Sequence, residues 1–334
     1  MKIIIPMAGM GKRMRPHTLT VPKPLIPIAG KPIVQRLAED IAAVCTEKIE
    51  EIAFVIGDFG KETEDTLIAI AASLGAKASI YYQHEALGTA HAIYCAEKSL
   101  SGKVIVAFAD TLFRAAFKLD EEADSIIWVH KVENPSSFGV VKISDKKLIT
   151  DFIEKPKEFV SNLAIIGIYY FKDGNILRDE LKFLLDNNIV VNGEYQLTDA
   201  LQNMKSKQMK MFPGEVEEWL DCGNKDNTVY TNQRILETHS NEKMIDETSV
   251  INNSIIIPPC FIGKDAQIEN SVIGPHVSIG YNTIIKNSLL KNSIIMRNSH
   301  IEDLNVTNSM IGNFVDIKGE SRELNIGDYT VISK

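Results

Sequence analysis

The first residues with the chemistry of a binding site form a glycine-rich loop near the N-terminus. Residues 8–14 read AGMGKRM directly after a short aliphatic segment, and residues 22–25 read PKPL. Glycine has no Cβ, so a ligand can approach its backbone closely, and successive N–H groups can hold anionic oxygens. Arg13 and Lys23 add positive charge of the kind a triphosphate needs. The loop therefore predicts a phosphate-binding site.

The spacing within this loop differs from two other common phosphate-binding patterns. A Walker A loop has four residues between its first glycine and a Gly-Lys pair, and then Ser or Thr. Here a single residue separates Gly9 from Gly11, and Arg13 follows the lysine. The dinucleotide pattern G-x-G-x-x-G fails at Met14.

Two further polar side chains follow aliphatic runs that resemble buried strands. Asp110 comes two residues after the aliphatic run 104–108, and open α/β sheets bind ligands at the carboxyl ends of their strands. A carboxylate there could hold Mg²⁺ together with phosphate oxygens, although a strand-end turn alone would also explain an aspartate. Gln83 follows residues 79–82, and its amide can both donate and accept, which suits the edge of uracil or thymine.

The elements that would position these residues alternate in type through the first part of the chain. Short aliphatic runs predict strands, and amphipathic stretches between them predict helices, which is typical of a mostly parallel sheet flanked by helices. The expected strands are 3–5, 52–56, 79–82 and 104–108, and the expected helices are 32–45, 61–74 and 89–99. A mixed lobe should complete this α/β unit with strands 126–132, 139–143 and 165–171 and helices 173–186, 195–206 and 225–238.

Beyond residue 238 the sequence becomes repetitive. Residues 240–243 are polar and indicate a linker, and aliphatic residues then recur with a step of 17, as in Ile251, Ile268 and Ile285. Asn-Ser pairs repeat with the same step, and Ile-Gly pairs recur. Coils of three short strands would give this pattern and must stack to bury their cores. The segment resembles a left-handed parallel β-helix of the hexapeptide-repeat kind, with about four coils.

Six further segments resemble, in the right order, the motifs of one enzyme family. Together with the glycine loop they are similar to those of sugar-1-phosphate nucleotidylyltransferases, also called NDP-sugar pyrophosphorylases, over roughly residues 2–238. The segments are Gln83 with LGTAHA at 87–92, FAD at 108–110, FGV at 138–140, FIEKP at 152–156, EYQLTD at 194–199 and WLDCG at 219–223. A β-helix accompanies this domain in known members of the family. The expected domains are 1–238, a linker at 239–249, and a β-helix at 250–334.

The resemblance implies an in-line transfer of a nucleotidyl group from an NTP to a sugar 1-phosphate, with release of pyrophosphate and no covalent enzyme intermediate. It assigns catalysis to Arg13, Lys23, Asp110, Lys155 and Asp221. It assigns nucleotide binding to Ala8, Gly9, Gly11, Arg13, Lys23, Gln83, Gly88, Thr89 and Asp110. It assigns the sugar phosphate to Gly139, Glu154, Lys155 and Glu194, and Mg²⁺ to Asp110 and Asp221. His91 is expected to be structural.

Composition excludes several other classes of protein. The formal net charge of −8 and the lack of a long Lys/Arg run argue against a nucleic-acid polymer as a partner. No segment reaches the roughly 20 apolar residues of a membrane span, and the N-terminus is apolar too briefly for a signal peptide. The four cysteines match no metal-binding spacing. We therefore expect a cytoplasmic enzyme without a membrane partner, which forms a homo-oligomer through its β-helix.

Three alternatives remain open at this stage. The first is a guanylyltransferase that acts on mannose 1-phosphate. The residues favour UTP or dTTP but do not exclude GTP, and they do not separate glucose or N-acetylhexosamine from other sugars. The second is a non-catalytic regulatory subunit, although such relatives usually lose charged residues that are present here. The third is a β-helix with acyltransferase activity, which its few coils disfavour. Lys12 also departs from the family, which usually has Thr or Ser there.

Overall fold

The chain forms two compact units. The computed structural model describes residues 1–115 and 118–320. The first unit comprises Met1–Ile26 and Lys31–Asn224, and the second comprises Pro27–Gly30 and the chain from Lys225 onward. The predicted boundaries were 238 for the first domain and 239–249 for a linker. The compact units divide near residue 224, and the second unit includes both the helix at 225–238 and residues 239–249, while the domain boundaries remain a prediction.

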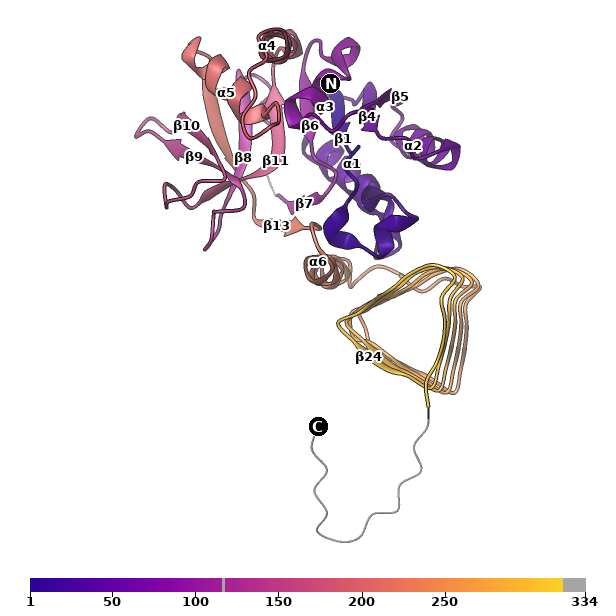
Figure 1. The fold of residues 1–334 in the computed structure, drawn as a ribbon. Helices are drawn as coiled ribbons and strands as arrows, with labels where there is room; N and C mark the ends of the chain where they lie inside the picture. The colour runs from indigo at the N-terminus through magenta and orange to yellow at the C-terminus, as the bar shows by residue number, and fades with distance from the viewer. Residues whose placement is uncertain (116–117, 321–334) are drawn as a thin grey trace. The chain divides into compact units, whose positions relative to one another are not determined.

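A nine-stranded mixed sheet forms the centre of the first unit (Figure 1). Its order is β10-β9-β11-β6-β1-β4-β5, and β8 pairs with both β11 and β12. The strands are β1 (Lys2–Pro6), β4 (Glu51–Ile56), β5 (Lys77–Tyr82), β6 (Val104–Ala107), β8 (Ser125–Lys131), β9 (Gly139–Ile143), β10 (Ile149–Glu154), β11 (Leu163–Phe171) and β12 (Met211–Glu215). β1 lies between β4 and β6 in parallel, whereas β11 runs antiparallel to β6. The predicted mostly parallel α/β sheet is confirmed.

Helices cover this sheet because their apolar faces match its buried strands. α3 (Thr89–Tyr94), α4 (Gly174–Asp186) and α5 (Leu197–Ser206) share one core with Ile4 and Val106. Ile3 and Ile5 are also fully buried, and the alternation of a strand points them to the opposite face. α1 (Ile33–Val44) contacts the short strand β7 (Thr111–Arg114), and α2 (Lys61–Ser73) contacts β5.

Several short elements in the first unit were not predicted. β7 pairs antiparallel with β13 (Glu218–Asp221), and each has four residues with a charged end, so neither shows a clear alternation. β10 and β12 were also missed. The helix predicted for 89–99 ends at Tyr94 and is followed by the 3₁₀ turn η4 (Glu97–Ser99). Three more 3₁₀ turns follow β1, namely η1 (Lys12–Met14), η2 (His17–Leu19) and η3 (Lys23–Leu25). The remaining short strands are β2 (Pro27–Ile28) and β3 (Lys31–Pro32).

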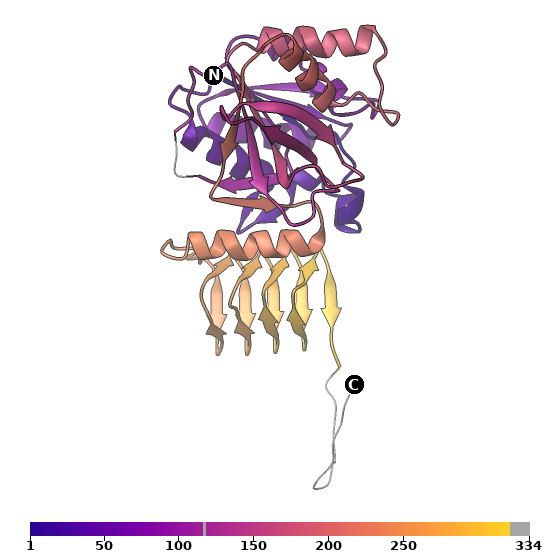
Figure 2. The ribbon, with the colours of Figure 1, turned by 90° about the vertical axis from the view of Figure 1, so that its left-hand side faces the viewer.

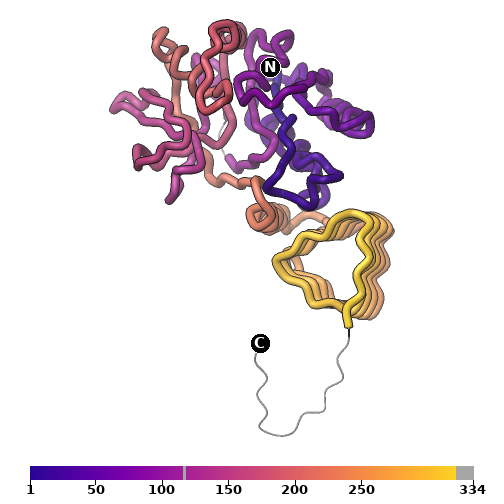
Figure 3. The backbone as a smooth tube through the Cα atoms, viewed as in Figure 1, coloured from indigo at the N-terminus to yellow at the C-terminus, as the bar shows by residue number. Residues whose placement is uncertain are grey.

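The second unit contains the predicted β-helix, whose coils are triangular in Figure 3. Helix α6 (Lys225–Thr238) runs along the stack of coils (Figure 2). One side of the β-helix has five parallel strands, β14 (Val250–Asn252), β17 (Gln267–Glu269), β20 (Ile284–Lys286), β23 (His300–Glu302) and β26 (Asp316–Lys318). The second side has β15 (Ile255–Ile256), β18 (Val272–Ile273), β21 (Leu289–Lys291) and β24 (Asn305–Thr307). The third has β16 (Cys260–Ile262), β19 (Val277–Ile279), β22 (Ser293–Ile295) and β25 (Met310–Ile311).

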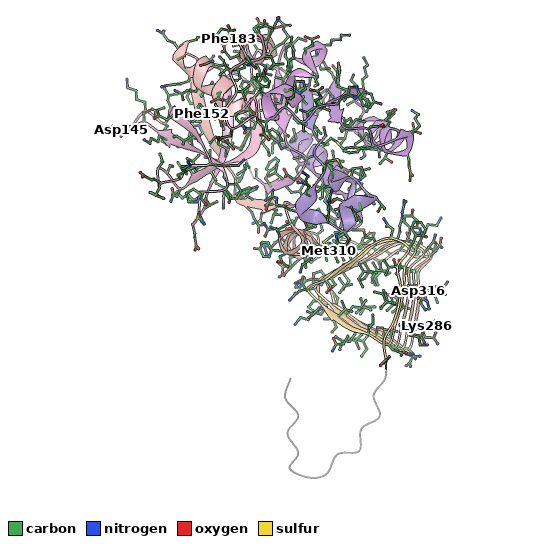
Figure 4. All side chains as sticks on the ribbon, viewed as in Figure 1. Asp145, Phe152, Phe183, Lys286, Met310 and Asp316 are labelled. Carbon is green, nitrogen blue, oxygen red and sulfur yellow. The ribbon has the colours of Figure 1, made fainter. Side chains whose placement is uncertain are left out.

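The repeat and its asparagines have a direct structural cause. Ile251, Ile268 and Ile285 pair in register on successive coils, which confirms the step of 17. Ile285 then pairs with Ile301, so the later coils are one residue shorter. Aliphatic side chains fill the coils, while Lys286 and Asp316 lie on the outside (Figure 4). Asn253, Asn270 and Asn287 have φ of 46°, 49° and 48°, a left-handed conformation that asparagine tolerates better than most residues. Their amides bond from coil to coil, at 2.6 Å and 3.3 Å.

Candidate nucleotide-binding site

The glycine-rich loop leaves the sheet at the carboxyl end of β1. The Met7 N–H still bonds to the Val55 carbonyl at 2.8 Å, and the chain then turns away. Gly11 has φ +56°, and a Cβ there would lie 3.0 Å from Thr18 Cγ2 and 3.1 Å from Lys23 Cβ. The Thr18 hydroxyl donates to the Gly11 carbonyl at 2.8 Å. Gly11 is therefore required by the turn, whereas a Cβ at Gly9 would meet no described atom within 4 Å.

Lys23 and Asp110 form an ion pair in the same region. Lys23 Nζ lies 2.6 Å from Asp110 Oδ2, and their side chains are 14% and 35% exposed. Lys23 is on η3, and Asp110 follows β6, so the pair joins the end of the glycine-rich segment to the end of a central strand. The pair holds both side chains in a defined geometry while leaving the carboxylate partly open to a ligand.

Short strands bring Asp221 close to Asp110, although 110 residues separate them in sequence. Asp221 on β13 lies opposite Thr111 on β7, and the Cys222 N–H donates to the Asp110 carbonyl at 2.8 Å. The Gly223 N–H donates to Asp221 Oδ1 at 2.9 Å. A Cβ at Gly223 would lie 3.2 Å from Arg13 Nη2 and 2.9 Å from Asp221 Oδ1. Asp110, Asp221 and Arg13 therefore converge on this turn.

The two carboxylates have the donor chemistry that Mg²⁺ prefers. Within residues 1–115 and 118–320, no cluster of three His, Cys, Asp or Glu side chains could hold a metal by itself. Mg²⁺ usually takes one or two carboxylates and completes its octahedron with water and substrate phosphate oxygens. Asp110 and Asp221 therefore fit a metal that binds together with a nucleotide rather than a permanent structural metal.

The loop between β5 and α3 places Gln83 and Gly88 side by side. Gln83 Nε2 lies 3.2 Å from the Gly88 carbonyl oxygen. Gly88 has φ +110°, and a Cβ there would lie only 2.5 Å from the Tyr195 carbonyl oxygen. The Tyr195 N–H donates to Leu87 O at 2.8 Å, and the Leu197 N–H donates to Thr89 Oγ1 at 3.0 Å. The backbone at residues 195–197 therefore holds this loop in place, and it can approach so closely only because Gly88 has no Cβ.

The residues predicted for the sugar phosphate lie around β9 and β10. Lys155 has φ +41°, is 61% exposed, and holds its Nζ 3.4 Å from Glu154 Oε1. A Cβ at Gly139 would lie 3.0 Å from Glu154 Oε2, so this glycine makes room for the carboxylate. Glu194 accepts a hydrogen bond from Gln196 Nε2 at 3.0 Å. Burial, and then the nearby charge of Glu154, raise the pKa of Tyr169.

A cavity of about 270 Å³ brings most of the predicted nucleotide site together. Its walls include these predicted residues: Ala8, Gly9, Gly11, Lys23, Gln83, Gly88, Thr89, Asp110 and Glu194. Arg13, Asp221, Gly139, Glu154 and Lys155 do not line it. Met7, Ala86, Ala92 and Phe108 also line it and were not predicted. Ala92 and Phe108 belong to the LGTAHA and FAD segments, so reading every member of each motif would have found them.

Comparison with known proteins defines the class. The Nucleotidyl transferase family profile matches residues 2–238, and the profile of the GMPPB C-terminal domain matches residues 256–334. The chain belongs to the nucleotidyl transferase family. The first of these matches ends where the sequence placed the end of the domain, beyond the division between the compact units.

Individual relatives fall within the same class. The chain is 32% identical over 251 residues to the low-salt glycan biosynthesis nucleotidyltransferase Agl11 of Haloferax volcanii, covering 73% of this chain and 68% of that protein. It is 31% identical to the bifunctional protein GlmU of Methanococcus vannielii, covering 67% of this chain and 52% of that protein. It is 29% identical to a mannose-1-phosphate guanylyltransferase catalytic subunit beta of Drosophila pseudoobscura pseudoobscura, covering 80% and 72%.

Solved structures confirm the fold of the first unit. A UDP-glucose pyrophosphorylase complexed with UDP-glucose aligns with a TM-score of 0.59 at 24% identity, covering 71% of this chain and 98% of that one. A putative glucose-1-phosphate thymidylyltransferase from Bacillus anthracis aligns equally well, with a TM-score of 0.59 at 23% identity over 69% of this chain and 93% of that one. Within the described residues, no helix is long and apolar enough to cross a membrane.

Proposed function

We propose that this protein transfers a nucleotidyl group from an NTP to a sugar 1-phosphate and releases pyrophosphate. The observation that carries this proposal is the single cavity that joins the glycine loop, the Lys23–Asp110 pair and the Gln83–Gly88 loop. One cavity thus contains anion-binding backbone, a cation next to a carboxylate, and amide groups that can read a base edge. The names of the relatives and neighbours, which include two pyrophosphorylase-type activities, agree with it.

The reaction requires one displacement at the α-phosphorus. A phosphate oxygen of the sugar 1-phosphate forms a bond to the α-phosphorus, the bond to the bridging oxygen of pyrophosphate breaks, and pyrophosphate leaves with the electron pair. Lys23 is held by Asp110 at 2.6 Å, so its ammonium group is positioned before the triphosphate binds. Arg13 and the N–H groups of the loop would neutralise further charge on the triphosphate and on the leaving pyrophosphate.

Mg²⁺ would be held by Asp110 and Asp221 and would supply charge neutralisation on the phosphates. Lys155 would hold the phosphate of the sugar substrate, and Glu154 and Glu194 would accept hydrogen bonds from sugar hydroxyls. The Lys155 side chain is 61% exposed and its Nζ lies 3.4 Å from Glu154 Oε1, so the two groups lie close enough to contact one sugar phosphate.

The Gln83–Gly88 loop, called here the base end of the cavity, suits UTP or dTTP. Gln83 Oε1 and the Gly88 N–H have no hydrogen-bond partner among the described residues, so two residues of the cavity wall offer one free acceptor and one free donor. Uracil and thymine present a carbonyl oxygen next to a ring N–H, which complements this pair. We propose glucose 1-phosphate or an N-acetylhexosamine 1-phosphate as the acceptor, and the names of the solved neighbours support glucose.

A guanylyltransferase acting on mannose 1-phosphate is the second candidate. Guanine also presents a carbonyl oxygen next to a ring N–H, so it satisfies the same donor and acceptor. The match of residues 256–334 to the GMPPB C-terminal domain and the guanylyltransferase relative favour this candidate. A non-catalytic subunit is disfavoured because Arg13, Lys23, Asp110, Lys155 and Asp221 are all present.

Pyrophosphate release across a matrix of NTPs and sugar 1-phosphates, with Mg²⁺, tests the proposal. We expect release for one NTP with one sugar 1-phosphate, which would name both substrates. Folded protein that binds nucleotide but releases no pyrophosphate in any combination would favour the regulatory subunit instead. The cytoplasmic location and the homo-oligomer remain predictions, and light scattering on the purified chain tests the second.

A further inference from the structure

His91 contacts Gln83 but does not itself line the cavity. Gln83 Nε2 lies 3.0 Å from His91 Nδ1 and 3.2 Å from the Gly88 carbonyl oxygen. A carbonyl oxygen can only accept a hydrogen bond, so the amide atom that contacts Gly88 must be the nitrogen. The same nitrogen then donates its second hydrogen to His91, so Nδ1 accepts and the imidazole carries its proton on Nε2. The contacts therefore define both the amide orientation and the histidine tautomer.

This arrangement leaves one group of Gln83 for a ligand. Both hydrogens of its amide are used, and Oε1 has no partner in residues 1–115 and 118–320. Gln83 lines the cavity, whereas His91 does not. The neutral form of histidine, which has the accepting nitrogen, is favoured because burial lowers the pKa of His91, against a smaller opposing effect of the Glu85 carboxylate. Gln83 thus presents a fixed acceptor to the cavity, and His91 acts on it without touching the ligand.

We propose that His91 is a positioning residue that locks the Gln83 amide and thereby selects bases with a ring N–H against cytosine. The proposal rests on the function proposed above, since it concerns the nucleotide of that reaction. The N3–H of uracil or thymine, or the N1–H of guanine, can donate to a fixed Oε1. Cytosine has a lone pair on N3, which would face the lone pairs of Oε1. An amide turned by 180° would accept cytosine, and the turned amide would leave His91 Nδ1 without a donor.

The Gly88 carbonyl supplies only part of this lock. It opposes a turned amide as well, because Oε1 would then face a second acceptor, but its contact is the longer of the two at 3.2 Å. Removal of the His91 acceptor should therefore weaken the preference rather than abolish it. A histidine that only packs helix α3 would instead affect all nucleotides alike.

Two variants at one position separate these roles. His91→Leu removes the acceptor, whereas His91→Asn keeps one, because its Oδ1 can occupy nearly the position of Nδ1. We would measure kcat/KM for the preferred NTP and for CTP with the same sugar 1-phosphate. For His91→Leu we expect the ratio of the two values to fall about 10-fold, as for the loss of one hydrogen bond, with the KM for the sugar 1-phosphate unchanged. For His91→Asn we expect a ratio within about threefold of the unchanged protein.

A double-mutant cycle with Gln83→Leu shows whether His91 acts through the glutamine. His91→Leu should change the ratio little when Gln83 is already replaced, because the amide that it orients is gone. If His91→Leu does not fold, His91→Gln would take its place. The equilibrium dissociation constants of the preferred NTP and of CTP would then be compared instead of their kcat/KM values. An unchanged ratio in active His91→Leu, or an equal loss for both nucleotides in His91→Leu and His91→Asn, would overturn the role of His91. Absence of turnover by the unsubstituted chain with every NTP would overturn the proposed function itself.

Discussion

At the scale of single residues, the account depends on Asp110 and Asp221. Their backbones are joined through β7 and β13, where Cys222 N–H bonds to the Asp110 carbonyl at 2.8 Å. Asp110 also holds Lys23, so it contributes both to the expected metal site and to the placement of a cation. A change of charge at either aspartate should therefore affect chemistry more than folding.

Replacement of either aspartate by asparagine should lower kcat by about 10² to 10³, as for other preorganised electrostatic contacts. Asn keeps the size of the side chain, so we expect little change in the thermal midpoint. Asp145→Asn is the matched control, because Asp145 is exposed at the turn between β9 and β10 (Figure 4). Steady-state pyrophosphate release and a thermal melt measure the two effects. Full activity in Asp110→Asn would contradict the metal assignment.

At the scale of elements, Gly88 connects the start of α3 to the segment that precedes α5. A Cβ there would lie 2.5 Å from the Tyr195 carbonyl oxygen, and the residue has φ +110°. We expect Gly88→Ala to lower the free energy of unfolding by about 2 kcal/mol or more, from strain together with the clash. Gly102→Ala is the control, because Gly102 has φ +67° but no described neighbour within 4 Å of a Cβ. Equal losses in the two variants, measured by urea unfolding, would show that Tyr195 is not the cause.

Glu121 connects the end of α1 to the central sheet. Burial by itself would raise the pKa of this carboxyl, but hydrogen bonds from Thr46, Glu47 and Lys103 outweigh burial and lower the pKa to about 2, from 4.5. A lowered pKa stabilises the fold above pH 4.5, and this contribution is lost as the pH falls toward 2. It amounts to roughly 2–3 kcal/mol.

The replacement Glu121→Gln should therefore reduce the stability at pH 7 and flatten its dependence on pH between about 4.5 and 2. Glu122→Gln provides the comparison, because that side chain is 78% exposed. Urea unfolding at several pH values measures both slopes. If Glu121→Gln keeps the full acid dependence of the unchanged chain, other carboxyls are responsible.

At the scale of the whole molecule, the second unit includes a short segment from far back in the sequence. Asn232 of α6 is fully buried, and its Oδ1 accepts from Ala29 N–H at 2.9 Å and from Ser278 Oγ at 2.7 Å. A Cβ at Gly30 would lie 2.2 Å from Phe261 Cζ, so residues 27–30 pack tightly within this unit.

Asn232→Ala should remove the shared acceptor of two hydrogen bonds and lower the stability of this unit by about 2–5 kcal/mol. Asn241→Ala is the control at an exposed asparagine. Hydrogen exchange of the β-helix amides in the full chain reports on this unit separately from the first. Unchanged exchange in Asn232→Ala would contradict a stabilising role of the buried amide.

The sequence predicted the architecture because its signals are local. Aliphatic runs mark the central strands, and the asparagines at 253, 270 and 287 mark the corners of successive coils. The β7–β13 pair was missed because four residues with charged ends carry no alternation, and yet it joins Asp110 to Asp221. The place of Pro27–Gly30 in the second unit depends on packing against α6 and Phe261, which no local pattern contains.

Within the candidate site, the glycine loop, Lys23, Gln83 and Gly88 were predicted from motif types, and the structure brings them into one cavity. His91 was expected to be structural, because a motif cannot show which way a neighbouring amide points. Its contact with Gln83 appears only in the folded loop. The roles of the predicted site residues remain predictions that the variants above test.

The most direct test of the central claim follows the α-phosphorus. The purified chain, Mg²⁺ and a sugar 1-phosphate would be incubated with UTP or dTTP, and with GTP, each labelled at an α-phosphorus made chiral by replacing one non-bridging oxygen with sulfur. The account predicts that the label enters an NDP-sugar, that the released pyrophosphate is unlabelled, and that the configuration at the α-phosphorus is inverted once. Label that leaves only as a nucleoside monophosphate, or an NDP-sugar formed with retention of configuration, would contradict direct transfer to the sugar 1-phosphate.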